Sequence, residues 1–134
     1  MLTILSIPKR FDGHFGMIQR NAARSWARLQ PRPEIILFGS DEGTAEMAAE
    51  IGAIHIADVA LSPAGAPMLD DLLAKGQERA SHPIVCFLNA DIVLTPQWMR
   101  AVETAARWRS RSGCGAGSRR RRSARGDGDR GAAR

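Results

Sequence analysis

The apolar residues of this chain gather in four short runs. Each run is rich in Ile, Leu, Val or Phe and is followed within two positions by proline, glycine or a polar residue, which is typical of buried strands. We predict strands over residues 2–7, 34–38, 53–56 and 83–88. The last run, PIVCFL, is apolar along its whole length, which predicts a central strand covered on both faces.

The stretches between these runs have the spacing of amphipathic helices. In the first stretch one apolar face is formed by Ile18, Ala22, Trp26 and Leu29. We predict helices over residues 16–29, 44–51, 68–80 and 96–107. The second is ended by Gly52, at a position where a left-handed residue is common.

Strands that alternate with helices predict an α/β protein with a parallel, doubly wound, Rossmann-like sheet. The predicted core consists of Trp26, Ile36, Phe38, Leu72, Val85, Phe87 and Val102. We expect Trp26 to pack in this core rather than to contact a ligand. Ligands of such sheets bind beyond the carboxyl ends of the strands. We therefore expect the ligand-binding residues in segments 8–14, 40–42, the loop near Asp58, and 89–91.

Charge is distributed unevenly along the 134 residues, whose net charge is +5. The first 108 residues hold 10 basic and 12 acidic side chains, whereas the last 26 hold nine arginines and two aspartates. Residues 109–134 contain only Arg, Gly, Ser, Ala, Asp and one Cys, a composition that cannot bury a core. We predict a folded domain over residues 1–107 and a disordered Arg/Gly-rich tail over 108–134.

Several classes of protein are excluded or disfavoured. No apolar run approaches the roughly 18 to 20 residues that span a bilayer, and residues 1–7 are too short for a secretory signal, so we expect a cytoplasmic protein without a membrane span. Cys86 and Cys114 lack the spacing of a metal cluster or a disulfide framework, and we expect both thiols to be reduced. The absence of a P-loop lysine motif and of GxGxxG argues against a P-loop protein or a dehydrogenase.

The sharpest local feature is Asn89-Ala90-Asp91, which follows the fourth apolar run directly. A carboxylate at the end of a strand can hold Mg²⁺ or Mn²⁺, which often takes only one or two protein carboxylates together with phosphate oxygens of a substrate. Asp91 therefore suits a metal-bridged diphosphate. The alternative is that Asn89 and Asp91 only cap a turn by accepting hydrogen bonds from nearby backbone N–H groups.

Polar residues also follow the first two strands. Asp41 or Glu42 can accept a hydrogen bond from a ribose hydroxyl or a base N–H, or can instead favour the start of the next helix through its dipole. Lys9, Arg10 and His14 lie in the segment before the first helix, whose N–H groups suit an anion. Gln19 and its neighbours Arg20 and Asn21 are expected mainly on a solvated face, and the alternative is that one of them reaches the ligand.

Taken in order, these stretches resemble a family of bacterial glycosyltransferase-like proteins with the A-type nucleotide-diphospho-sugar transferase fold. The matching segments are LTILSIPKRFDGHFGMIQRNAARSW, EIILFGSDEGTAEMAAEIG, GAPMLDDLLAKGQERA and IVCFLNADIVLTPQW, which together cover about residues 1–107. The resemblance implies glycosyl transfer from a nucleotide sugar to an unknown acceptor. A divalent cation, Mn²⁺ or Mg²⁺, would stabilise the departing diphosphate.

The resemblance also implies roles for particular residues. In this family an Asp-x-Asp motif after the fourth strand holds the metal and the sugar diphosphate, and here Asn89 replaces its first acid while Asp91 keeps the second. Ile7 and Pro8 would border the nucleotide base, with Asp41 or Glu42 near the base or ribose. Asp70 and Asp71, which begin the third predicted helix, would lie beside the donor pocket.

The chain departs from the family after about residue 107. Family members carry a second half there, which supplies the acceptor site and any catalytic base, so the resemblance assigns no catalytic residue here. The Arg, Gly, Ala and Ser monotony of the tail is what GC-rich coding DNA gives when it is read out of frame. Our hypothesis is that a frameshift near Arg107 leaves a truncated, nucleotide-binding half.

Two other functions remain open at the level of sequence. The domain can be a nucleotide-binding fragment without catalysis, or the chain can be an interaction protein that acts through its basic tail. Arginines interspersed with glycine neutralise phosphates, but the tail has no aromatic residue on which bases stack. Any nucleic-acid binding by the tail is therefore expected to be non-specific.

Overall fold

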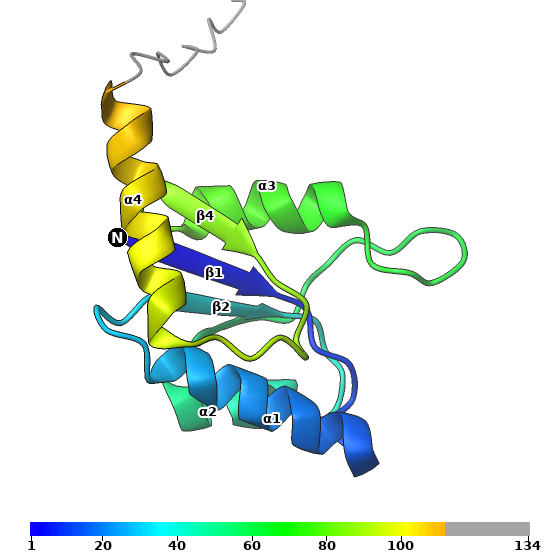
Figure 1. The fold of residues 1–134 in the computed structure, drawn as a ribbon. Coiled ribbons are helices and arrows are strands. Elements are labelled where there is room, and N and C mark those ends of the chain that lie inside the picture. The colour runs from blue at the N-terminus through cyan, green and yellow to red at the C-terminus, as the bar shows by residue number, and fades with distance from the viewer. Residues whose placement is uncertain (112–134) are drawn as a thin grey trace, which may run out of the picture.

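The computed structural model describes residues 1–111, and the remaining residues of the predicted tail lie outside the described part of the chain. Strands and helices alternate along it, as predicted (Figure 1). The elements are β1 (Leu2–Ser6), α1 (Gly13–Ala27), β2 (Glu34–Phe38), α2 (Thr44–Ile51), β3 (Ile54–Ile56), α3 (Leu69–Arg79), β4 (Ile84–Phe87) and α4 (Pro96–Arg111).

The four strands form one parallel sheet with the order β3-β2-β1-β4. Ile4 in β1 pairs with Ile35 in β2 on one side and with Cys86 in β4 on the other. The chain therefore proceeds outward from β1 through β2 to β3 and then returns to the opposite side of β1. This reversal creates a topological switch point between β1 and β4, where α/β sheets bind ligands beyond the ends of the strands.

Helices cover both faces of the sheet, so the predicted α/β class with a parallel sheet is confirmed (Figure 1). One face packs against α1, α2 and α4 through a cluster that includes Ile4, Trp26 and Met99. The other face packs against α3 through Leu5 and Leu72. Alternate residues of β1 thus enter opposite clusters, as the two-residue period of a strand requires.

The expectation that the fourth strand is central is wrong for the described residues. β4 pairs only with β1 in residues 1–111 and occupies an edge of the sheet. Its run is apolar throughout because each face is covered: Cys86 packs toward the cluster of α1 and α4, whereas Phe87 packs toward α3. An apolar run therefore indicates that both faces of a strand are covered, and it does not indicate that the strand pairs with another strand on each side.

Most boundaries agree with the sequence-based predictions. β2 and α2 have the predicted limits, and Gly52 adopts the left-handed conformation, with φ of +63°. α1 begins three residues earlier than predicted, at Gly13. The apolar spacing did not indicate these residues, because the first turn is solvent-exposed and carries no apolar stripe. α4 continues to Arg111 and crosses the predicted domain boundary at 107.

The predicted core residues lie in or against the two clusters. Trp26, Ile36, Phe38 and Leu72 are fully buried. Val85, Phe87 and Val102 are only partly buried, because β4 is an edge strand and α4 packs on one side only. Within residues 1–111 no helix is long and apolar enough to cross a membrane.

Cys86 forms no disulfide within the described chain, and burial raises the pKa of its thiol. Its role here is packing in β4. Cys114 lies among the residues that the structure does not describe.

Candidate functional site

Two adjoining clefts open at the carboxyl edge of the sheet. The large cleft, about 610 Å³, is lined by residues 7–10, by residues 39–41 and by part of the loop 57–68, which projects from the sheet in Figure 1. The small cleft, about 330 Å³, is lined by Ile7, Lys9, Phe15, Gln19 and residues 89–91. The structure therefore brings together the segments that follow β1, β2, β3 and β4, as expected for the edge of a parallel sheet.

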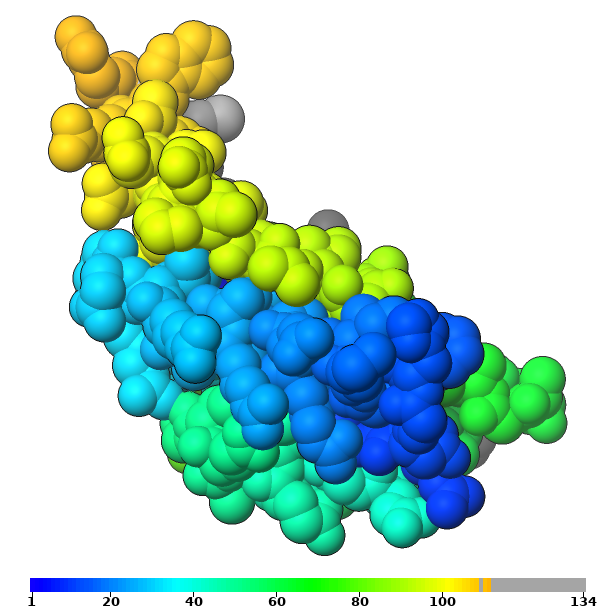
Figure 2. Space-filling view, turned by 60° about the horizontal axis from the view of Figure 1, so that its bottom comes forward, coloured from blue at the N-terminus to red at the C-terminus, as the bar shows by residue number. Residues whose placement is uncertain are grey.

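The segment that carries Asn89 and Asp91 is held firmly by β1 and α1. The Leu88 amide donates to the Leu5 carbonyl at 2.9 Å, and the Ser6 hydroxyl donates to the Leu88 carbonyl at 2.7 Å. Further along, the buried indole of Trp26 donates to the Ile92 carbonyl at 2.8 Å. Figure 2 shows this segment, in yellow-green, beside the blue surface of α1. The position of Asp91 is thus set on both sides by fixed main chain.

Asn89 and Asp91 do not cap the turn with their side chains. The turn is closed by the main chain, where the Ile92 amide donates to the Asn89 carbonyl at 3.2 Å. Neither side chain forms a hydrogen bond or ion pair with another residue in 1–111, and both are exposed in the small cleft. Their oxygen atoms are consequently available to a ligand.

Asp41 and Glu42 occupy different environments. The Glu42 carboxylate lies 2.9 Å from the Arg10 guanidinium, while the Glu42 carbonyl accepts from the Phe11 amide at 2.9 Å. Asp41 lines the large cleft and has no side-chain partner in the described part of the chain. The N-cap of α2 is Gly43, with φ of +91°, and no side chain caps this helix. Of the two acids, Asp41 is the one presented to a ligand.

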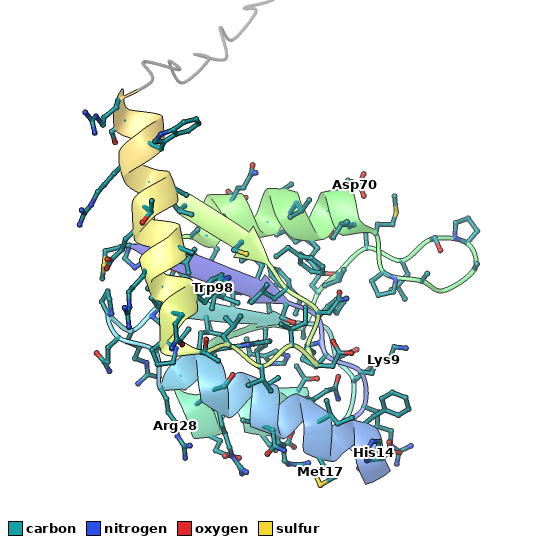
Figure 3. The ribbon with its side chains drawn as sticks, viewed as in Figure 1. Lys9, His14, Met17, Arg28, Asp70 and Trp98 are labelled. Atoms are coloured by element: carbon teal, nitrogen blue, oxygen red, sulfur yellow. The ribbon has the colours of Figure 1, made fainter. Side chains whose placement is uncertain are left out.

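Ile7 and Pro8 are placed where a ligand in the large cleft would meet them. Ile7 is half-buried and lines both clefts, whereas Pro8 is buried and lines the large cleft. His14 is exposed at the start of α1 and lines neither cleft (Figure 3).

Gln19 is a site residue that the sequence analysis assigned to a solvated face, and that expectation is wrong. Its side chain is only 5% exposed. The Gln19 amide nitrogen donates to the Lys9 carbonyl at 2.9 Å, and its amide oxygen accepts from the Lys9 N–H at 2.7 Å. The helical spacing could have predicted this burial, because Gln19 lies four residues before the buried Ala23 and seven before the buried Trp26, on the same face of the helix.

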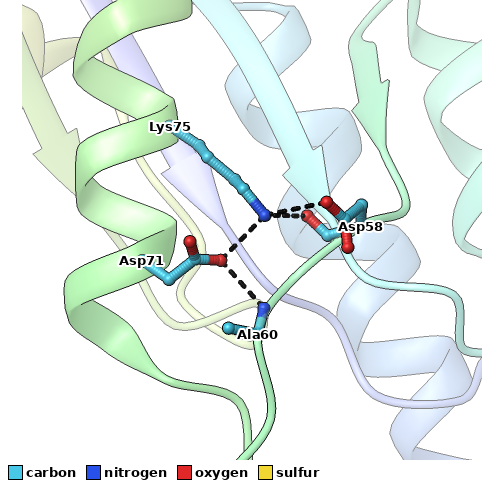
Figure 4. A network of polar contacts seen from close by, with 4 residues as sticks. All are labelled: Asp58, Ala60, Asp71 and Lys75. Carbon is cyan, nitrogen blue, oxygen red and sulfur yellow. Dashed lines mark hydrogen bonds and ion pairs between the residues drawn. The ribbon is translucent and has the colours of Figure 1, made fainter.

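Asp71 holds the loop 57–68 against α3 (Figure 4). Its carboxylate accepts from the Ala60 amide at 2.8 Å and lies 2.9 Å from the Lys75 ammonium, which also lies 3.0 Å from the Asp58 carboxylate. The Ala60 N–H and the neighbouring Lys75 keep the pKa of Asp71 below its ordinary value. Asp71 thus shapes a wall of the large cleft without lining it, and Asp70 is exposed at the start of α3, on its outer side (Figure 3).

We expect Asp71→Ala to loosen this loop. Without the carboxylate, the Ala60 amide loses its acceptor and Lys75 loses one of its two acidic partners, so amide hydrogen exchange over residues 57–68 should become several-fold faster. Exchange measured by mass spectrometry checks this. Asp70→Ala is the matched control because Asp70 has no partner in the network, and equal exchange rates in the two variants would contradict the role given to Asp71.

The oxygen donors of the small cleft fit a divalent cation only with help from a ligand. Asp91 supplies a carboxylate and Asn89 an amide oxygen, and Mg²⁺ accepts such a partial set when phosphate oxygens and water complete its coordination. Within residues 1–111 there is no group of three or more His, Cys, Asp or Glu side chains able to hold a metal. A cation at this cleft would therefore bind together with a phosphorylated ligand.

Comparisons with known proteins do not assign the chain to a family. No family model matches the chain, and no curated protein matches it.

Proposed function

We propose that this protein binds a nucleotide sugar at the carboxyl edge of its sheet. The nucleoside would occupy the large cleft, beside Ile7, Pro8 and Asp41, and the sugar diphosphate would extend into the small cleft, toward Asn89 and Asp91. In this proposal the domain is the nucleotide-binding half of an A-type glycosyltransferase fold. Glu42 would act indirectly, by holding the loop after β1 through Arg10.

The observation that carries the proposal is the presence of an unpartnered carboxylate in each of two adjoining clefts. Asp41 faces the large cleft and Asp91 the small cleft, and neither has a side-chain partner in residues 1–111. The volume of the large cleft, about 610 Å³, falls in the usual range for small-molecule sites. A carboxylate can accept hydrogen bonds from ribose hydroxyls in the large cleft and can bind a cation in the small cleft.

The small cleft also has the composition expected of a sugar subsite. Phe15 contributes an apolar wall with a relative exposure of 64%, while Asn89 contributes an amide group and Asp91 a carboxylate. Apolar surface combined with a few polar groups is the usual character of ligand pockets. A divalent cation at Asp91 would stabilise negative charge on the diphosphate, and in transfer it would act as a Lewis acid on the leaving group.

Calorimetric titration of the full-length chain with UDP- and GDP-sugars, with and without Mn²⁺, tests the proposal. We expect saturable binding of at least one nucleotide sugar that becomes tighter with Mn²⁺. Binding of nucleotide sugars neither with nor without the cation would overturn the proposal. Assay of donor hydrolysis on the same samples separates a transferase from a binding module, because only a catalytic protein releases the free sugar.

A further inference from the structure

The two clefts share one polar residue. Ile7 and Lys9 are the residues that line both, and Ile7 is apolar. Figure 3 shows Lys9 in the loop beyond the end of β1. A ligand that occupies both clefts must therefore pass the Lys9 side chain with its middle portion.

Lys9 is also the uncommitted cation of this region. Arg10 is paired with Asp12 at 3.2 Å and with Glu42 at 2.9 Å, and Arg20 lies 5.4 Å from the centre of the Phe11 ring. The Lys9 ammonium, by contrast, has no ion pair with any residue of the described chain, and the residue is exposed. Its charge is available to a ligand.

The main chain of Lys9 is fixed although its side chain is exposed. Buried Gln19 clamps both sides of the residue, accepting from its N–H at 2.7 Å and donating to its carbonyl at 2.9 Å, with a longer bond of 3.4 Å to the Arg10 carbonyl. The point from which the Lys9 side chain extends is consequently fixed at the junction of the clefts. A main chain that is already fixed reduces the conformational entropy that is lost when a ligand binds.

We propose that Lys9 binds the diphosphate of a nucleotide ligand, at the point where the large cleft meets the small one. The inference rests on the proposed function and names its phosphate-binding residue. Carboxylates of Asp41 and Asp91 line the two clefts and repel a diphosphate, so a positive group between them favours its binding. Lysine serves phosphates as a point charge, and a cation at Asp91 would neutralise only one end of the ligand.

The test compares nucleoside diphosphates with nucleosides in the full-length protein. Calorimetric titration with UDP, GDP, CDP and ADP, and with the matching nucleosides, is carried out without added metal on wild type and Lys9→Met. We expect Lys9→Met to weaken binding of the favoured diphosphate about tenfold or more. It should leave the matching nucleoside unchanged and reduce the salt dependence of diphosphate binding. Lys9→Arg should retain most of the affinity.

Arg28→Met is the matched control, because it removes the same charge from an exposed residue at the other end of α1 (Figure 3). Equal diphosphate affinities in Lys9→Met and Arg28→Met would overturn the role of Lys9 and leave nucleotide binding standing. An equal loss for nucleoside and diphosphate in Lys9→Met would also overturn it, since Lys9 would then support the cleft wall. Failure of the wild type to bind any of the diphosphates and nucleosides without metal would overturn this inference, whereas the proposed function fails only if nucleotide sugars also do not bind in the presence of Mn²⁺.

Discussion

Trp26→Ala should strongly destabilise the protein and lower its melting temperature. Trp26 is fully buried between the sheet and the helices of one face, and replacing such a residue by alanine costs about 3–5 kcal/mol. Domains of this size have a stability of about 5–15 kcal/mol, so a substantial share of the free energy of unfolding would be lost. We expect the melting temperature to fall by about 12–30 °C, measured by circular dichroism or calorimetry.

Two further variants separate packing from hydrogen bonding at Trp26. Trp26→Phe keeps an aromatic ring in the core but removes the indole N–H that binds the Ile92 carbonyl, so it should cost less stability and yet accelerate amide exchange around residues 88–95. Phe15→Ala is the surface control, because Phe15 is 64% exposed, and should change stability by no more than about 0.5 kcal/mol. A melting temperature of Trp26→Ala within a few degrees of wild type would show that the core does not depend on this residue.

The fold was predictable where apolar spacing carries the information. β2 and α2 have the predicted limits because their apolar residues, their bounding glycines and their lengths agree with one element type. The place of β4 in the sheet was not predictable from its own sequence. Strand order depends on which edges pair, and the apolar pattern of a strand records only what covers its faces.

The candidate site was predictable in part. The rule that ligands bind beyond the carboxyl ends of strands selected Asp41 and Asp91 from sequence, and both lie in clefts. The rule did not separate Asp41 from Glu42, because only the fold brings Arg10 beside Glu42. The burial of Gln19 was not predicted because a glutamine on a helix is usually solvated, and because its partners are main-chain groups nine or ten residues earlier in the chain.

The topology explains why the polar groups converge. Lys9 follows β1 and Asn89 follows β4, and these neighbouring strands flank the point where the strand order reverses. Phe15 and Gln19 of α1 face the segment 89–91 across this point, and a crevice remains between them. The small cleft is this crevice, and the large cleft continues it toward β3, under the loop that Asp71 holds.

Asp91→Asn should strongly weaken the effect of a divalent cation on nucleotide binding. Asp91 supplies the carboxylate of the small cleft, and its loss should lower the affinity of Mn²⁺ for the complex of protein and nucleoside diphosphate by about tenfold or more. Binding of the nucleoside alone should be unchanged because Asp91 does not line the large cleft. Calorimetric titration of the diphosphate with and without Mn²⁺, combined with the electron paramagnetic resonance signal of free Mn²⁺, measures both effects.

The reciprocal variant is Asn89→Asp, which adds a second carboxylate to the same cleft. Asn89 is exposed and its side chain has no partner in residues 1–111, so the substitution should not disturb the fold. Two carboxylates hold a divalent cation more tightly than one, and Mn²⁺ should then bind in the absence of nucleotide. Opposite shifts in the two variants place the cation at this cleft. If Asp91→Asn leaves the Mn²⁺ effect intact and Asn89→Asp gains no affinity for the ion, the cation binds elsewhere and the small cleft is not a metal site.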